Sequence, residues 1–251
     1  MKIFNELFKL KIKNNNGRKA SLGICAVFVI TLLSFAPAFA APTGMEILNT
    51  ASNKIKQANN AQANAAITVW DDKGKVNLQN DTIVKIDFKN KISRIDVGSG
   101  TALYRGMILV IDNLKNEAFM YYQVANIYYK GTISRVLGNG DSTVSQLINY
   151  DISRYLMYDT SALSSAKFLR EEVINRVNYY VVEMRTKDSP TTYQLVWIDS
   201  NTYDVYKVES YLASNNSKTF QVVLTNFKTN VTDITPAKLK EMPKGAREVK
   251  A

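Results

Sequence analysis

Runs of alternating apolar and polar residues, joined by short turns, restrict the fold of this 251-residue chain more than any other feature. In "DTIVKIDFKNKISRIDVG" one extended run points Val84, Ile86 and Phe88 to one side, and the next run does the same with Ile95 and Val97. Four longer runs follow later, "RVNYYVVEMRTK", "TTYQLVWID", "YDVYKVESYLA" and "KTFQVVLTNFKTN". A period of two is typical of strands that bury one face, and short connections predict an antiparallel sheet.

Patterns of helical period interrupt the strands in three places. Thr43 and Glu46 form a capping box before apolar residues at helical spacing, which predicts a helix from about 44 to 59. The segment "GNGDSTVSQLINYDISRYLMYD" predicts a second helix, and residues 160 to 169 predict a short third one. We interpret the second helix as a lid, with an apolar side made by Val144, Leu147, Ile148 and Ile152.

The order of elements defines an α+β fold class: a helix, five or six strands, two helices and four strands. A sheet this long must curl because strands twist, and helices must cover its apolar face. The sequence therefore predicts a curled antiparallel sheet forming an unclosed half β-barrel, with helices on the concave face. The apolar concave face is expected to consist of Val84, Ile86, Phe88, Ile95, Val97, Leu109, Ile111, Tyr180, Val182, Met184, Tyr193, Leu195, Trp197, Tyr206, Val208, Phe220, Val222 and Leu224.

Residues 1–40 have the pattern of a secretory signal peptide: a basic start, the uncharged run "LGICAVFVITLLSF", and small residues in "APAFAA". We predict cleavage between Ala40 and Ala41, which leaves a single domain, 41–251. A retained membrane anchor is the alternative, because the uncharged stretch 20–41 is about as long as a bilayer span requires. Cys25 lies early in the apolar run, which is the wrong place for lipid attachment.

The composition leaves few means of catalysis. The chain has no histidine, and its one cysteine lies within residues 1–40. Adjacent carboxylates at Asp71-Asp72 and Glu171-Glu172 would point to opposite faces of a strand, so neither pair forms a catalytic dyad. We therefore expect no enzyme, no catalytic residue, no metal and no cofactor.

The net charge gives no reason to expect nucleic acid as a partner. It falls from +10 to +5 when the six basic residues and one acidic residue of 1–40 are removed. Basic residues are not clustered among aromatic ones, as they are in many nucleic-acid-binding proteins. A curled sheet covered by few helices can instead leave an apolar cavity. A 16-carbon acyl chain would gain on the order of 10 kcal/mol there, at about 0.8 kcal/mol per CH₂.

Four segments, in this order, resemble the LolA/LolB-like periplasmic lipoprotein carriers: "MEILNTASNKIKQ", "TALYRGMILVIDNLKNEAFMYY", "YQLVWIDSNTYDVYKVESY" and "VVLTNFKTNVTDITPAKLKEMPKGAREVK". The resemblance covers most of 44–251. It implies a monomeric periplasmic carrier of acylated lipoproteins or lipids, with an inner-membrane release complex and an outer-membrane receptor as partners. It also implies that Arg94 holds the lid. The segment "DFKNKISRID" departs from the family in lacking a proline, and Arg105-Gly106 stands where Asp-Gly is common.

Three alternatives remain open at this point. The same half-barrel occurs in envelope-stress sensors of the RseB type, which bind a partner protein. The chain could also bind lipid without serving lipoproteins. A third alternative is a structural protein whose interior is filled.

Overall fold

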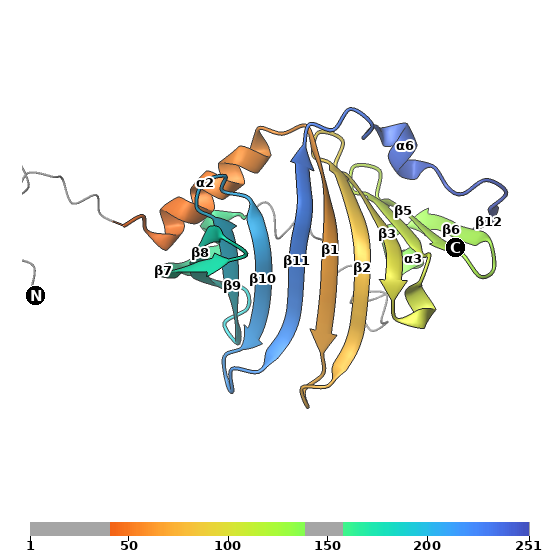
Figure 1. The fold of residues 1–251 in the computed structure, drawn as a ribbon. Coiled ribbons are helices and arrows are strands. Elements are labelled where there is room, and N and C mark those ends of the chain that lie inside the picture. The colour runs from red at the N-terminus through yellow and green to blue at the C-terminus, as the bar shows by residue number, and fades with distance from the viewer. Residues whose placement is uncertain (1–40, 139–157, 251) are drawn as a thin grey trace, which may run out of the picture. The chain divides into compact units, whose positions relative to one another are not determined.

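A single twelve-stranded sheet organises the residues that this computed structural model describes, 41–138 and 158–250 (Figure 1). The first part of the chain contains α2 (Gly44–Lys56), β1 (Asn60–Trp70), β2 (Val76–Asp87), β3 (Ile92–Gly100), η1 (Ala102–Tyr104), β4 (Ile108–Asp112), β5 (Glu117–Tyr122), β6 (Ile127–Thr132) and α3 (Ile133–Leu137). The second part contains η2 (Thr160–Ala162), β7 (Leu163–Ile174), β8 (Val177–Thr186), β9 (Thr192–Asp199), β10 (Val205–Leu212), β11 (Lys218–Thr229), α6 (Pro236–Lys240) and β12 (Arg247–Lys250).

The sheet is assembled from two meanders that meet at its centre. Its strand order is β12-β6-β5-β4-β3-β2-β1-β11-β10-β9-β8-β7, so β1 pairs with β11 and the two outermost strands do not pair with each other. All neighbouring pairs are antiparallel except β12 and β6, which are parallel. In Figure 1 both ends of the sheet bend back from the central strands. The result is the α+β unclosed half-barrel that the sequence predicts.

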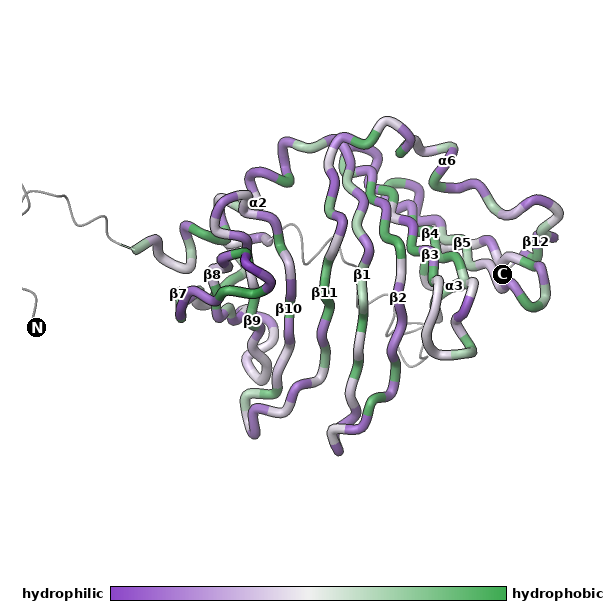
Figure 2. Tube along the Cα trace, viewed as in Figure 1, coloured by the Kyte–Doolittle hydropathy of each residue, from purple (hydrophilic) through white to green (hydrophobic). Residues whose placement is uncertain are grey.

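The inner face of the sheet carries the main hydrophobic core. Apolar residues at alternate positions of the strands form one buried cluster with apolar residues of α2. Figure 2 shows the alternation of hydrophobic and hydrophilic residues along the central strands. Helix α2 begins with the expected capping box of Thr43 and Glu46 and contributes Ile47, Leu48 and Ile55, each at most 2% exposed. Burying a side chain of this kind stabilises a fold by roughly 1.5–3 kcal/mol. Helix α2 contacts β7 and β8, so it covers that end of the inner face.

The outer face has a second, smaller core beneath the C-terminal segment. Leu239 of α6 and Ile234 contact a cluster that includes Val110 and Phe119. Lys240 anchors the same segment through the carboxylate of Asp112, at 2.5 Å. Strand β4 is consequently buried on both faces, which accounts for its continuous apolar run.

The elements that follow residue 159 differ from those that the sequence predicts. The helix predicted at 160–169 is wrong: after η2 the chain enters β7, because pairing with β8 outweighs the helical spacing of its apolar residues. The second half of the chain therefore has five long strands and not the four that were predicted. It also contains β12, which the sequence did not predict. The predicted lid helix, with Val144, Leu147, Ile148 and Ile152, lies outside the described residues. Within the described ranges no helix is both long and apolar enough to cross a membrane.

Candidate functional site

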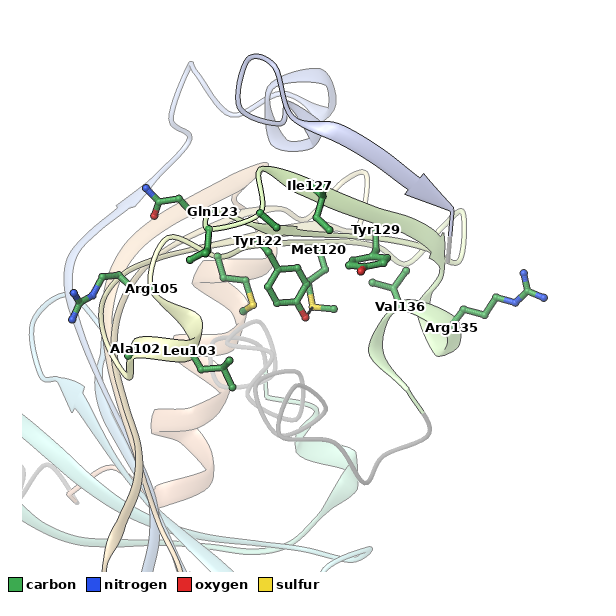
Figure 3. Close-up of a pocket in the computed structure, with 13 residues that line it drawn as sticks. Ala102, Leu103, Arg105, Met120, Tyr122, Gln123, Ile127, Tyr129, Arg135 and Val136 are labelled. Atoms are coloured by element: carbon green, nitrogen blue, oxygen red, sulfur yellow. Dashed lines mark hydrogen bonds between the residues drawn. The ribbon is translucent and has the colours of Figure 1, made fainter.

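An apolar pocket of about 920 Å³ opens on the inner side of the β4–β6 end of the sheet (Figure 3). Strands β5 and β6, the loop around η1, and helix α3 surround it. Among the described residues, those that line it are Ala102, Leu103, Arg105, Met107, Met120, Tyr122, Gln123, Val124, Ala125, Ile127, Tyr129, Arg135 and Val136. Its volume is near the upper end of the range of about 300–1,000 Å³ that is usual for ligand pockets.

The inner wall of the pocket is continuous with the main core. Met107, Met120 and Val136 line the pocket and are also buried members of the inner-face cluster. The rings of Tyr122 and Tyr129 meet edge to face, with centroids 6.0 Å apart. Because methionine is flexible and polarisable, this wall can adapt to apolar groups of different shape.

The hydroxyl group of Tyr122 stays neutral at physiological pH. It donates a hydrogen bond to Met120 Sδ at 3.4 Å. Burial raises the pKa of Tyr122, and the neighbouring Tyr129 adds to this effect. Tyr122 thus adds no charge to the pocket.

The mouth of the pocket combines exposed apolar side chains with arginines. Leu103 is 71% exposed and Val124 is 99% exposed. Leu103 belongs to η1 and Val124 to the β5–β6 turn, so two different segments bring apolar side chains to the mouth, which Arg105 and Arg135 also line. A large apolar side chain that is exposed beside an apolar pocket marks a surface suited to an apolar ligand.

The sequence-predicted concave face lies beside this pocket and does not line it. Fourteen of its eighteen residues belong to the inner-face core or pack against it. None of the eighteen is among the residues that line the pocket. The inner face is thus solidly packed along most strands and hollow at the β4–β6 end.

Four residues of that predicted face lie on the outer face, so their expected placement is wrong. On β9 the inward residues are Val196 and Ile198, which places Tyr193, Leu195 and Trp197 outside. Both faces of this strand are apolar, so alternation alone did not determine its orientation. Tyr206 also points outward. An irregularity between Val205 and Lys207 changes the alternation of β10, and Val205 and Val208 both point inward.

Trp197 points outward, and neighbouring side chains on the outer face stabilise it. The ammonium group of Lys207 lies 3.6 Å from its ring centroid. Lys207 and Lys218 both approach the carboxylate of Glu209, at 3.5 and 2.7 Å. Burial opposes ionisation of Glu209, but hydrogen bonds from Lys218 and Tyr211 hold its pKa below the ordinary value. Aromatic rings and ion pairs therefore cover the outer face of β9–β11.

Arg94, the residue expected to hold a lid, contacts the C-terminal segment instead. It lies on the outer face of β3, where its guanidinium pairs with Asp96 at 2.8 Å. The same group donates hydrogen bonds to the carbonyl oxygens of Leu239 and Glu241. These contacts fasten the C-terminal segment to the outer face, and the lid-holding role remains a prediction.

The sequence does not predict the pocket, because its strands alternate between apolar and polar residues like the rest of the sheet. One signal was available: Leu103 and Val124 stand in connecting segments, where polar residues are the usual choice. Within 41–138 and 158–250, no group of three or more metal-ligating side chains occurs.

The fold and the pocket together define a class of protein: an unclosed half-barrel with an apolar pocket on its inner side. The sequence matches no family model and no curated protein. An uncharacterized conserved protein from Thermus thermophilus has a similar structure, with a TM-score of 0.53 and 14% identity over 82% of this chain and 98% of that chain.

Two other solved structures are similar to a lesser degree. A LolA superfamily protein from Nitrosomonas europaea has a TM-score of 0.38 and 15% identity over 80% of this chain and 99% of that chain. A structure of the MucA/MucB complex from Pseudomonas aeruginosa has a TM-score of 0.42 and 11% identity over 79% of this chain and 61% of that chain.

Proposed function

We propose that this protein is an envelope carrier that binds the acyl chains of lipoproteins or lipids in the pocket at the β4–β6 end of the sheet. The observation that carries the proposal is the pocket itself, about 920 Å³ in volume and lined mainly by apolar side chains. A chain of sixteen carbons would gain on the order of 10 kcal/mol by leaving water, before the cost of ordering it is subtracted. Such binding requires no catalytic group.

The remaining parts of the proposal come from the sequence. Residues 1–40 would direct the chain out of the cytoplasm and be removed after Ala40, which places the carrier in the periplasm. The resemblance to lipoprotein carriers supplies the direction of transport, toward the outer membrane. It also supplies the partners, an inner-membrane release complex and an outer-membrane receptor, and a monomeric state.

Filling the pocket tests the proposal. Ala125 is exposed at the mouth, so Ala125→Trp should place an indole ring in the pocket without disturbing the core. The full-length protein and the variant would be titrated with pyrene-labelled hexadecanoic acid and followed by fluorescence. We expect the variant to lose at least tenfold in affinity.

Ala213→Trp is the matched control, because Ala213 is exposed in the β10–β11 connection and does not line the pocket. It should bind the probe as the wild type does. No uptake by the wild type, together with no acyl lipid in its organic extract by mass spectrometry, would exclude the carrier function. In that case the RseB-like sensor, which shares the fold, becomes the function to test, by capture of a purified anti-sigma factor.

A further inference from the structure

The turn between β5 and β6, residues 123–126, forms one side of the mouth of the pocket. Gln123, Val124 and Ala125 of this turn line the pocket. The whole turn is exposed, so none of its side chains is anchored in the hydrophobic core. A segment with few buried contacts opens easily unless other contacts hold it. The position of this turn therefore depends on its hydrogen bonds.

Asn126, the last residue of the turn, makes three such hydrogen bonds. Its Nδ2 donates to the carbonyl oxygen of Gly245 at 3.1 Å, and its Oδ1 accepts from the hydroxyl group of Tyr121 at 3.1 Å. Its backbone carbonyl oxygen accepts from the backbone N–H of Arg247 at 3.0 Å. Its φ of 49° lies in the left-handed region, which asparagine adopts more readily than most residues. One residue thus joins the turn to β5 and to the C-terminal segment.

The C-terminal segment is itself firmly attached to the outer face. Leu239 is 1% exposed, and the ammonium group of Lys240 lies 2.5 Å from the carboxylate of Asp112. Beyond α6, β12 pairs with β6 from Arg247 to Lys250 (Figure 1). The segment therefore provides a fixed support on the side of β6 that faces away from β5.

The turn also reaches across the mouth to the loop that follows η1. A Cβ atom at Gly106 would collide with the side-chain amide group of Gln123, so Gln123 lies directly against the backbone of that loop. A shift of the turn would move this side chain away from Gly106. It would also separate the two exposed apolar side chains of the mouth, Leu103 and Val124.

From these contacts we infer that Asn126 is a positioning residue, which holds the β5–β6 turn against the C-terminal segment and thereby slows the escape of a bound acyl chain. The inference rests on the proposed function. Asn126 is not among the described residues that line the pocket, whereas its neighbours Ala125 and Ile127 are. It therefore acts on the ligand through these neighbours. A segment on the outer face thus controls how fast a ligand leaves the inner side.

Two substitutions at residue 126 separate its side-chain contacts. Asn126→Gly allows the left-handed backbone conformation and removes both side-chain hydrogen bonds. Asn126→Asp keeps an acceptor for the hydroxyl group of Tyr121 and removes the donor to the carbonyl oxygen of Gly245. The full-length protein and each variant would be loaded with pyrene-labelled hexadecanoic acid. Stopped-flow mixing with excess phosphatidylcholine vesicles then gives the dissociation rate constant of the probe.

We expect Asn126→Gly to raise this rate constant roughly two- to tenfold, the factor that corresponds to the loss of a hydrogen bond. Asn126→Asp should raise it in the same direction, because the contact with the C-terminal segment is lost. Hydrogen exchange of the backbone amides should become faster at residues 123–127 and at Arg247, whose N–H donates to the turn. The exchange of the remaining amides of β5 and β6 should not change.

Asn116→Gly is the matched control. Asn116 has a φ of 50°, is exposed in the β4–β5 turn, and is not among the described residues that line the pocket. It should leave the dissociation rate constant and the exchange at residues 123–127 at their wild-type values. Comparison with this control separates the effect of residue 126 from that of any asparagine replaced by glycine in a turn.

The outcomes distinguish this inference from the function on which it depends. A wild-type dissociation rate in Asn126→Gly would overturn the inference and leave the carrier intact. A wild-type rate in Asn126→Asp would also overturn it, because the bond to Gly245 would then have no part in retaining the ligand. Faster exchange along the whole of β5 and β6 would assign the effect to the stability of the sheet and overturn it as well. Failure of the wild type to bind the probe would overturn the proposed function, and this inference with it.

Discussion

The rings of Tyr122 and Tyr129 meet edge to face, 6.0 Å between centroids, and form a wall of the apolar pocket. They are diagonal neighbours on β5 and β6, because Tyr122 pairs with Ile127 and Met120 with Tyr129. The next residue along β6, Tyr128, points to the outer face, where its hydroxyl group donates a hydrogen bond to Glu248 at 2.8 Å. Two adjacent tyrosines thus offer a comparison between the two faces of one strand.

Tyr129→Ala should weaken binding of an acyl probe, because it removes an apolar wall of the pocket. It should also lower the free energy of unfolding by the contribution of the ring pair, about 0.5–1.5 kcal/mol, together with some lost burial. Fluorescence titration measures the first effect and urea unfolding the second. Tyr128→Ala should lose stability and keep its affinity. Equal loss of affinity in both variants would show that the pocket does not depend on this wall.

Lys240→Met should destabilise the protein by roughly 3–5 kcal/mol, because it leaves the carboxylate of Asp112 buried without its partner. Asp112 is only 2% exposed, and its other hydrogen bond comes from the backbone N–H of Lys115. Urea unfolding of the single variants and of the double variant Asp112→Asn with Lys240→Met forms a double-mutant cycle. We expect the double variant to lose less than the sum of the two single changes. Strict additivity would mean that the pair contributes nothing.

The same carboxylate predicts how stability depends on pH. Burial works to raise the pKa of Asp112, but hydrogen bonds from Lys240 and from the backbone N–H of Lys115 outweigh it and hold the pKa below its ordinary value. A carboxyl group whose folded-state pKa is depressed stabilises the fold above the unfolded pKa, about 3.9, and loses that contribution as the pH falls through the folded value.

The free energy of unfolding should therefore fall as the pH drops below about 4, and it should fall less steeply in Asp112→Asn than in the wild type. Urea unfolding at pH 3, 4, 5 and 7 measures both slopes. If the free energy of unfolding falls equally steeply with pH in both proteins, carboxylates other than Asp112 cause the acid sensitivity.

Gly44→Ala should destabilise the start of α2. A Cβ atom at Gly44 would lie 2.7 Å from the backbone carbon of Lys167 and from the backbone nitrogen of Phe168, so the helix would have to move away from β7. Overpacking of this kind costs about 1–3 kcal/mol. Gly98→Ala is the control, because the nearest atom to its Cβ, the carbonyl oxygen of Asp81, is 3.5 Å away. Thermal unfolding of the two variants should differ by several degrees.

The sequence was sufficient to predict those elements that form through interactions between residues close together in the chain. The capping box of Thr43 and Glu46 located α2, since its bonds lie within one turn of helix. Alternation placed Val84 and Ile95 correctly on the inner face, because polar residues in those strands leave one orientation for burial.

Only the tertiary structure decided where the chain is hollow and which way some strands face. Leu195 and Val196 are both apolar, so the orientation of β9 followed from its neighbours in the sheet. Tyr206 turned outward at an irregularity that arises from pairing with β9. The pocket forms where β5, β6, η1 and α3 fail to fill the space between them, and a void of this kind is a property of the assembled elements. The sequence determined what each segment can bury, because burial patterns are local; the fold determined what remains unfilled, because packing is shared among distant segments.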